Sequence, residues 1–105
     1  MLGKNVGRKF DDGKPRWDLM PFACLNEVVK VLTFGAKKYD DNNWQQIEHP
    51  RDRYFAATLR HLTHRKVGEK YDEETGLHHI AHAICCLLFF LWFDIKEHNE
   101  TISSS

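Results

Sequence analysis

Apolar residues recur at helical spacing in two stretches of the chain, and each stretch begins near a proline. The first follows Pro21, and its apolar positions lie three or four residues apart: Phe22, Leu25, Val28 or Val29, Leu32 and Ala36. The second runs from Pro50 to just before Gly68, and its stripe consists of Phe55, Leu59 and Leu62. A single apolar face at this spacing predicts an amphipathic helix, and proline is tolerated in a first helical turn.

A third stretch, from about residue 77 to residue 98, has a different pattern. Its residues 83–93 are apolar on every side of a helix. Such a helix must be buried on several faces, and a chain of 105 residues supplies too few partners for it. We therefore expect this helix to pack against another subunit, in a homodimer or a homotetramer. The apolar run is too short to span a bilayer, so no membrane partner is expected.

Both ends of the chain are polar. Residues 1–18 form a basic arm in which Gly13 and Pro15 favour extended or turning backbone. Residues 100–105 are predicted to be a flexible tail. The whole pattern predicts one all-α domain over residues 1–105, a small bundle of three main helices with an extended N-terminal arm, completed by oligomerisation.

The amino-acid composition argues against some classes of partner and some cellular compartments. The chain has 15 Lys and Arg residues and 15 Asp and Glu residues, so a general electrostatic grip on a nucleic acid polymer is not expected. Its three cysteines do not suggest a disulfide framework, and no secretory signal is visible, which together favour the cytoplasm. Cys85 and Cys86 lie inside the apolar run and are expected in the core.

Several histidines form pairs at helical spacing. His61 and His64 lie three residues apart, as do His79 and His82, while His78 and His82 lie four apart. Members of each pair share a helix face, so up to five imidazoles meet if the second and third helices are antiparallel neighbours. Three interpretations stay open: a site for a divalent transition metal, a polar pocket for an anionic or heteroaromatic ligand, and helix caps or solvent-facing side chains.

An acidic loop connects the two helices that carry the histidines. Glu69, Asp72 and Glu73 offer carboxylates that can hold a magnesium ion beside a phosphate. The alternative is a solvated loop that caps the third helix through Asp72 or Thr75.

Cations and aromatic rings are interleaved along the rest of the chain. The cations that can reach phosphates are Lys14, Arg16, Lys37, Lys38, Arg53 and Arg60. The rings that can stack on a base are Phe10, Tyr39 and Trp44. A nucleotide needs both kinds of group together, which favours it over a protein partner. The alternative is an ordinary basic surface in which Trp44 anchors a loop.

Four motifs, in order along the chain, carry a resemblance to a known family. They are residues 9–21, residues 34–39 with Asn43 and Trp44, residues 53–54 with 60–61, and residues 68–69 with 76–83. Together they resemble the phage domain family named after the N-terminal part of dATP/dGTP diphosphohydrolase. That family is similar to the MazG-type all-α nucleoside triphosphate pyrophosphohydrolases. The resemblance covers residues 8–94 and implies a MazG-like dimer or tetramer in the cytoplasm of an infected bacterial host, with nucleotide sites near subunit interfaces.

One departure from the MazG-type pattern bears on the reaction. Those enzymes hold magnesium with Glu-x-x-Glu and Glu-x-x-Asp pairs on two helices. The corresponding places hold His61-x-x-His64 and His79-x-x-His82, and imidazole is a poor magnesium ligand. The primary interpretation is therefore a binding protein and not an enzyme. It sequesters a nucleotide or a nucleotide-derived immune signal without cleaving it, as an anti-defence sponge, and needs no cofactor.

Two alternatives accompany this interpretation. The first is a magnesium-dependent dATP/dGTP pyrophosphohydrolase that yields the deoxynucleoside monophosphate and pyrophosphate, with magnesium on Glu69, Asp72 and Glu73 and with His79 or His82 as the general base. The second is a transition-metal protein built on the histidine pairs. The ligand-binding candidates are Phe10, Lys14, Arg16, Lys37, Lys38, Tyr39, Asn43, Trp44, Arg53, Arg60, His61, His64, His78, His79 and His82.

Overall fold

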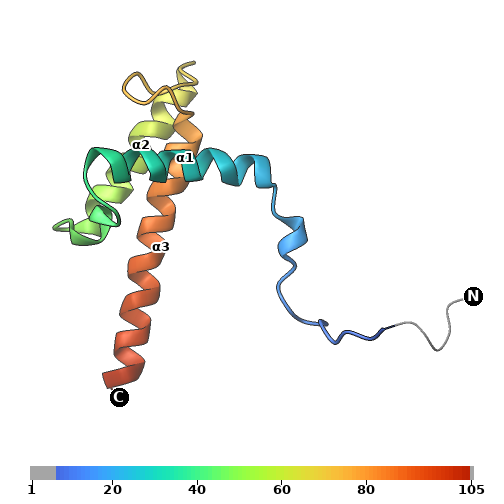
Figure 1. Cartoon of the computed structure of the whole chain (residues 1–105). Coiled ribbons are helices and arrows are strands. Elements are labelled where there is room, and N and C mark those ends of the chain that lie inside the picture. The colour runs from blue at the N-terminus through green and yellow to red at the C-terminus, as the bar shows by residue number, and fades with distance from the viewer. Residues whose placement is uncertain (1–6, 105) are drawn as a thin grey trace, which may run out of the picture.

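The computed structural model describes residues 7–104, which form an all-helical structure (Figure 1). The elements are a short 3-10 helix η1 (Trp17–Leu19), helix α1 (Phe22–Lys38), a 3-10 turn η2 (Asn43–Gln46), helix α2 (Pro50–Lys66) and helix α3 (His79–Ser104). The prediction of an all-α fold with three main helices is confirmed. Residues 1–6 of the expected arm and Ser105 of the expected tail lie outside the described residues.

Local chemistry explains where α2 begins and ends. Pro50 occupies the first turn, where its missing N–H costs nothing, and Asp52 follows it beside the positive end of the helix dipole. The last turn carries three basic residues, His64, Arg65 and Lys66, beside the negative end. Lys37 and Lys38 have the same role in the last turn of α1.

Helix α3 differs from its prediction at both ends. It begins at His79 and not near residue 77, because His78 forms a bridge with Tyr71 and is held in the preceding loop. It continues to Ser104, past the predicted end at His98, so most of the expected tail is helical. The Thr101 hydroxyl donates to the Glu97 carbonyl oxygen at 2.9 Å within this last segment.

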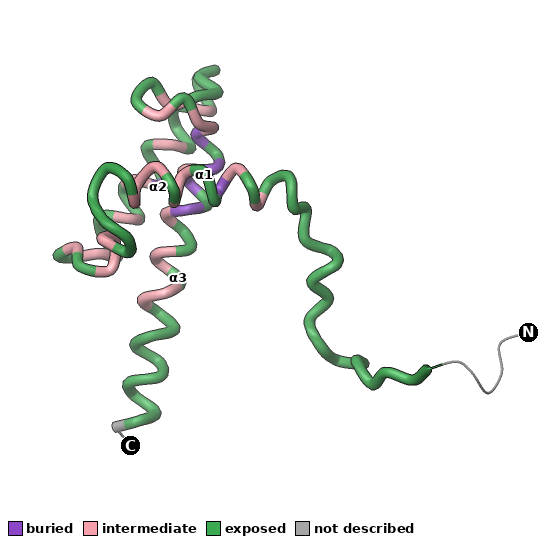
Figure 2. Tube along the Cα trace, viewed as in Figure 1, coloured by how far each residue is buried: buried purple, intermediate pink, exposed green. Residues whose placement is uncertain are grey.

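Helices α1 and α3 meet at a small core. Val28 of α1 packs against Ala81 and Cys85 of α3, and partly buried Val31, Leu32 and Phe89 surround them. Figure 2 shows that the buried residues cluster where α1 crosses α3, while the far half of α3 is largely exposed. Burial raises the pKa of Cys85 to about 12, as expected of an inert core thiol.

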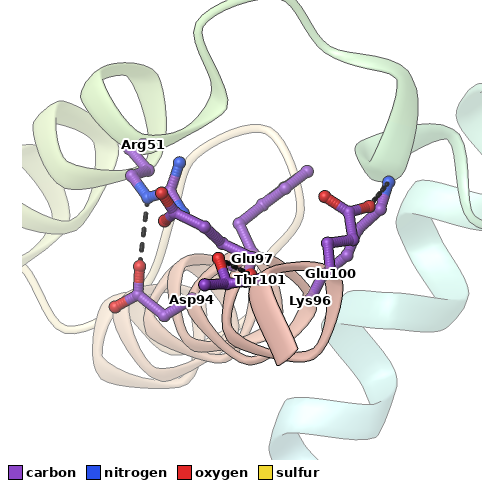
Figure 3. Close-up of polar contacts among 7 residues, drawn as sticks. Arg51, Asp94, Lys96, Glu97, Glu100 and Thr101 are labelled. Atoms are coloured by element: carbon purple, nitrogen blue, oxygen red, sulfur yellow. Dashed lines mark hydrogen bonds and ion pairs between the residues drawn. The ribbon is translucent and has the colours of Figure 1, made fainter. Parts of the chain in front are cut away.

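Arg51 at the start of α2 ties that helix to the far half of α3 (Figure 3). Its guanidinium donates to the Asp94 carboxylate at 3.0 Å and to the Glu97 carboxylate at 2.5 Å. It also donates to the Phe93 carbonyl oxygen at 3.2 Å. These ion pairs are exposed, so they position the helices more than they stabilise them.

The molecule is open. Its radius of gyration is 18.8 Å, whereas a compact domain of this length has about 13 Å. It exposes 8820 Å² of surface, whereas a compact monomer of 12.4 kDa exposes about 6,100 Å². Part of the excess comes from the arm, which runs away from the helices in Figure 1.

One face of α3 contributes exposed apolar surface. Its exposed aliphatic residues recur at steps of three and four, namely Ile80, Ile84, Leu87, Leu88, Leu91 and Ile95. By length and composition alone, residues His79–Ser103 could also cross a membrane, with a mean hydropathy of 1.5. The core helix of a soluble protein can have the same length and composition.

Candidate functional site

A cavity of about 880 Å³ lies between the C-terminal half of α1, the segment that follows it, α2, the loop before α3, and α3 itself. Nine of the predicted site residues line it: Lys38, Tyr39, Asn43, Trp44, Arg53, Arg60, His61, Asp72 and His82. Three of them are cations: Lys38 at the end of α1, and Arg53 and Arg60, which lie seven residues apart on α2. Four carboxylates line it as well, from Asp40, Asp41, Asp72 and Glu74, so the cavity brings charges of both signs together with aromatic and imidazole rings.

Lys38 lines the cavity and is held in place by its neighbours. Its ammonium group forms an ion pair with the Glu74 carboxylate and lies 5.3 Å from the centre of the Tyr39 ring. The hydrogen bond that Lys38 donates to the Glu74 carboxylate raises the pKa of Lys38. Tyr39 itself is 58% exposed, so its ring is accessible to a base.

Trp44 is an anchor as well as a lining residue. Its ring stacks on Phe89 of α3 with centroids 4.3 Å apart and meets Trp92 edge to face at 5.0 Å. The Tyr54 hydroxyl donates to its carbonyl oxygen at 3.0 Å, and burial raises the pKa of Tyr54 to about 12. These contacts correspond to the alternative in which Trp44 fastens a loop to the core.

Four imidazoles meet between α2 and α3. His61 stacks on His82 with centroids 4.6 Å apart, and His64 stacks on His79 at 4.9 Å. The Nδ1 atoms of His61 and His79 are 2.9 Å apart, a hydrogen-bonding distance. His78 does not join this group, because it precedes α3 and packs its ring against Tyr71.

The two imidazoles that line the cavity are neutral at pH 7. Burial, with the neighbouring His82 and His79, lowers the pKa of His61 to about 4. Burial also lowers the pKa of His82 below 6.5, although Asp72 opposes the shift. A neutral imidazole can accept a proton, which is a requirement for a general base near neutral pH.

The loop between α2 and α3 folds back on itself. The Asp72 N–H donates to the Leu77 carbonyl oxygen at 2.8 Å, and the His79 N–H donates to the Lys70 carbonyl oxygen at 2.9 Å. Gly68 and Gly76 have φ angles of 105° and 71°, which favour glycine, at the two bends. This geometry places the tip of the loop beside α2 and α3.

Asp72 stabilises the loop and does not cap α3. Its carboxylate accepts the Thr75 N–H at 2.9 Å. Burial alone would raise its pKa, but this hydrogen bond and His82 lower the pKa of Asp72 below its usual range. The Thr75 hydroxyl in turn lies 2.7 Å from His82 Nε2 and thereby positions that ring.

The predicted magnesium ligands do not form an oxygen-rich site. Glu69 is paired with His64 at 2.8 Å, Asp72 accepts from Thr75, and Glu73 is exposed. The side chains whose ligand atoms lie within 4.8 Å of one another are mixed sets: His61 with Asp72 and His79, and His64 with Glu69 and His79. Because magnesium prefers oxygen ligands, these residues do not fit it.

The remaining candidates lie outside the cavity. Phe10, Lys14 and Arg16 are exposed on the arm, and Arg16 is paired with Asp18 at 2.5 Å. Lys37 is exposed at the end of α1. His64, His79 and Glu69 do not line the cavity either, although His79 contacts the lining residue His61.

Sequence reasoning missed Thr75, Glu74 and Tyr54 as lining residues. The spacing of Asp72 and Thr75 is a signal for a side-chain-capped turn, so Thr75 could have been found beside it. Nothing in the sequence pairs Glu74 with Lys38, since that contact joins residues 36 positions apart.

Comparisons with known proteins place the chain in a family. A family model described as "dATP/dGTP diphosphohydrolase, N-terminal" matches residues 4–102. A Salmonella phage PMBT28 protein named dATP/dGTP diphosphohydrolase is 40% identical over 87 residues, which cover 83% of this chain. The match covers only 29% of that relative's length. No solved structure matches the chain.

Proposed function

Because the chain belongs to the dATP/dGTP diphosphohydrolase N-terminal family, we propose that it binds a purine deoxynucleoside triphosphate in this cavity and hydrolyses it to the monophosphate and pyrophosphate. The observation that carries the proposal is the joint lining of one cavity by three cations and two neutral imidazoles. The name of the phage relative supports the substrate class and the reaction.

Lys38, Arg53 and Arg60 neutralise the phosphate chain in this proposal. Guanidinium groups form paired hydrogen bonds with phosphate oxygens and stabilise charge that develops during phosphoryl transfer. Lys38 reaches a ligand once the nucleotide displaces Glu74, its partner in the free protein. The exposed ring of Tyr39 supplies a surface on which the purine stacks.

His82 is the base in this proposal. Its imidazole is neutral at pH 7, lines the cavity and is oriented by the Thr75 hydroxyl. It accepts the proton of the attacking water while the bond between the leaving pyrophosphate and the α-phosphorus breaks. His79 is buried and does not line the cavity, so His82 is the better placed of the two predicted bases.

Binding without cleavage is the second candidate, and one observation favours it. The carboxylates of the loop do not converge on an oxygen-rich metal site, which is the usual way to activate a triphosphate. No finding supports the more specific expectation that the ligand is an immune signal held by a sponge.

We also propose that the chain acts as a homo-oligomer in the cytoplasm of an infected bacterial cell. The exposed aliphatic face of α3 and the large exposed surface support the oligomer. The phage relative supports the setting.

Product analysis tests the reaction. The purified chain is incubated with dATP or dGTP and a divalent metal ion, and nucleotides in the protein and solution fractions are identified by mass spectrometry. Monophosphate with pyrophosphate is expected, and His82→Gln should slow the rate by about 10²-fold or more. His98→Gln, on exposed α3, is the matched control and should be fully active. Intact nucleotide in the protein fraction alone would instead favour binding without cleavage.

A further inference from the structure

A buried imidazole nitrogen lacks a partner beside the cavity. The His79 side chain is only 4% exposed, and within residues 7–104 its Nε2 atom has no hydrogen-bond partner. Leaving a buried polar atom unsatisfied costs free energy, so each such atom in a folded protein calls for an explanation.

Two potential metal ligands face this nitrogen. The closest is the Glu69 Oε2 atom, 3.8 Å from His79 Nε2. The same carboxylate oxygen lies 2.8 Å from His64 Nδ1. All three ligand atoms lie within 4.8 Å of one another, and they come from α2, from the loop and from the start of α3.

We propose that His64, Glu69 and His79 bind one divalent transition metal ion of the zinc class, with water as the fourth ligand. Three protein ligands plus water is a common arrangement for zinc. Ligand bonds of about 2.0–2.1 Å place tetrahedral ligand atoms roughly 3.3 Å apart, and the observed 2.8 and 3.8 Å lie on either side of that spacing. Two nitrogens and one oxygen suit zinc or its neighbours, and not magnesium.

The second mixed set, His61 with Asp72 and His79, is already satisfied by hydrogen bonds. Nδ1 of His79 is within 2.9 Å of His61, and Asp72 accepts from Thr75. The contact with His61 fixes the His79 ring so that Nε2 points toward Glu69, as outer partners commonly do for metal-binding histidines.

The ion would link the loop between α2 and α3 to both of these helices. His64 and Glu69 are about half exposed, which gives the ion a path from solvent and room for its water ligand. The same loop carries Asp72 and Thr75, so a bound ion would also fix the wall of the cavity. The inference extends beyond the proposed reaction and concerns a different set of residues.

Metal binding without nucleotide tests the inference. Protein purified without a histidine tag is freed of metal with a chelator and titrated with Zn²⁺, Mg²⁺ and Co²⁺. We expect one Zn²⁺ per chain, no competition from Mg²⁺, and a visible Co²⁺ spectrum of the four-coordinate kind. His64→Gln and Glu69→Gln should each weaken Zn²⁺ binding at least about tenfold.

The controls separate this site from its neighbours. His78→Gln and Glu73→Gln change an adjacent histidine and an adjacent acid that belong to neither mixed set, and they should bind Zn²⁺ as the unaltered chain does. His64 and Glu69 carry the test because both are exposed, so their variants are expected to fold, with circular dichroism as the check.

Three results would overturn the inference: no stoichiometric Zn²⁺ binding, unchanged binding in both variants, or loss that follows Asp72→Asn and not Glu69→Gln. Its failure is distinguishable from failure of the proposed function. If the chain binds Zn²⁺ but cleaves no nucleotide, the metal site is supported and the proposed reaction is contradicted. If it cleaves dGTP but binds no Zn²⁺, the reaction is supported and the metal site is contradicted.

Discussion

At the scale of single residues, the molecule keeps imidazoles neutral in a setting rich in charge. His61 is flanked by His79 and His82 and partly removed from water, so its protonated form is disfavoured. The nearby Asp72 attracts a proton to this group but does not outweigh the burial. A ring with a pKa of about 4 stays neutral but is a weak proton acceptor, so His61 suits a hydrogen-bonding role better than that of a base.

Stability should therefore depend on pH through His61. The unfolded chain protonates this histidine near its ordinary pKa of 6.5, whereas the folded chain does so only near pH 4. Between these values the unfolded state binds more protons, so stability is full above pH 6.5 and falls as the pH drops to about 4.

Urea unfolding at several pH values measures this effect. In His61→Gln the free energy of unfolding should fall less between pH 6.5 and about pH 4. The reason is that this variant lacks one group that takes up a proton on unfolding in this pH range. A variant with the same pH dependence as the unaltered chain would show that His61 titrates normally in the folded state.

At the scale of elements, the loop before α3 is the part that organises the site. Its hydrogen bonds join residues 70 and 72 to residues 79 and 77, and its bends rely on Gly68 and Gly76. The helices alone bring the histidines together, but the loop supplies Asp72, Glu74 and Thr75 to the cavity.

Two glycine substitutions should have opposite effects on stability. At Gly76 an added Cβ meets open space but the φ of 71° strains an L residue, so Gly76→Ala should cost about 1 kcal/mol. At Gly35, inside α1 and equally open, Gly35→Ala should stabilise by about 0.5–1 kcal/mol. Equilibrium unfolding measures the free energy of unfolding of both variants. A change of the same sign in the two variants would contradict the assignment of backbone strain to Gly76.

Sequence periodicity was sufficient for the helices but not for the loop. The three- and four-residue spacing of His61, His64, His79 and His82 predicts which rings share a face, and the structure places these four together. The turn at Asp72 depends on backbone hydrogen bonds that no periodicity encodes. The function of the arm could not be predicted in this way, because the side chains of Phe10 and Lys14 are exposed and lie outside the cavity.

At the scale of the whole molecule, an open chain with an exposed aliphatic helix face is expected to associate. The face of α3 that includes Leu91, which is 52% exposed, has no partner within residues 7–104. Burying such a face against a second copy is favoured by about 25 cal/mol for each Å² of apolar surface.

Light scattering coupled to size exclusion measures this association. We expect a dimer or tetramer for the unaltered chain, and a shift toward monomer for Leu91→Glu, because a charge on the covered face opposes burial. Lys96→Glu, exposed on another side of α3, should retain the oligomer. A monomeric unaltered chain at all concentrations would contradict the proposal.

Nucleotide affinity tests the central claim most directly. Calorimetric titration with a dGTP analogue that cannot be hydrolysed should show one site per chain in the unaltered protein. Arg60→Ala should weaken binding by roughly 10- to 100-fold, because a charge-assisted hydrogen bond contributes about 1.5–3 kcal/mol. Lys66→Ala, on the same helix but outside the cavity, should bind as the unaltered chain does. Equal affinity in the Arg60→Ala variant and the unaltered chain would contradict the assignment of this cavity as the nucleotide site.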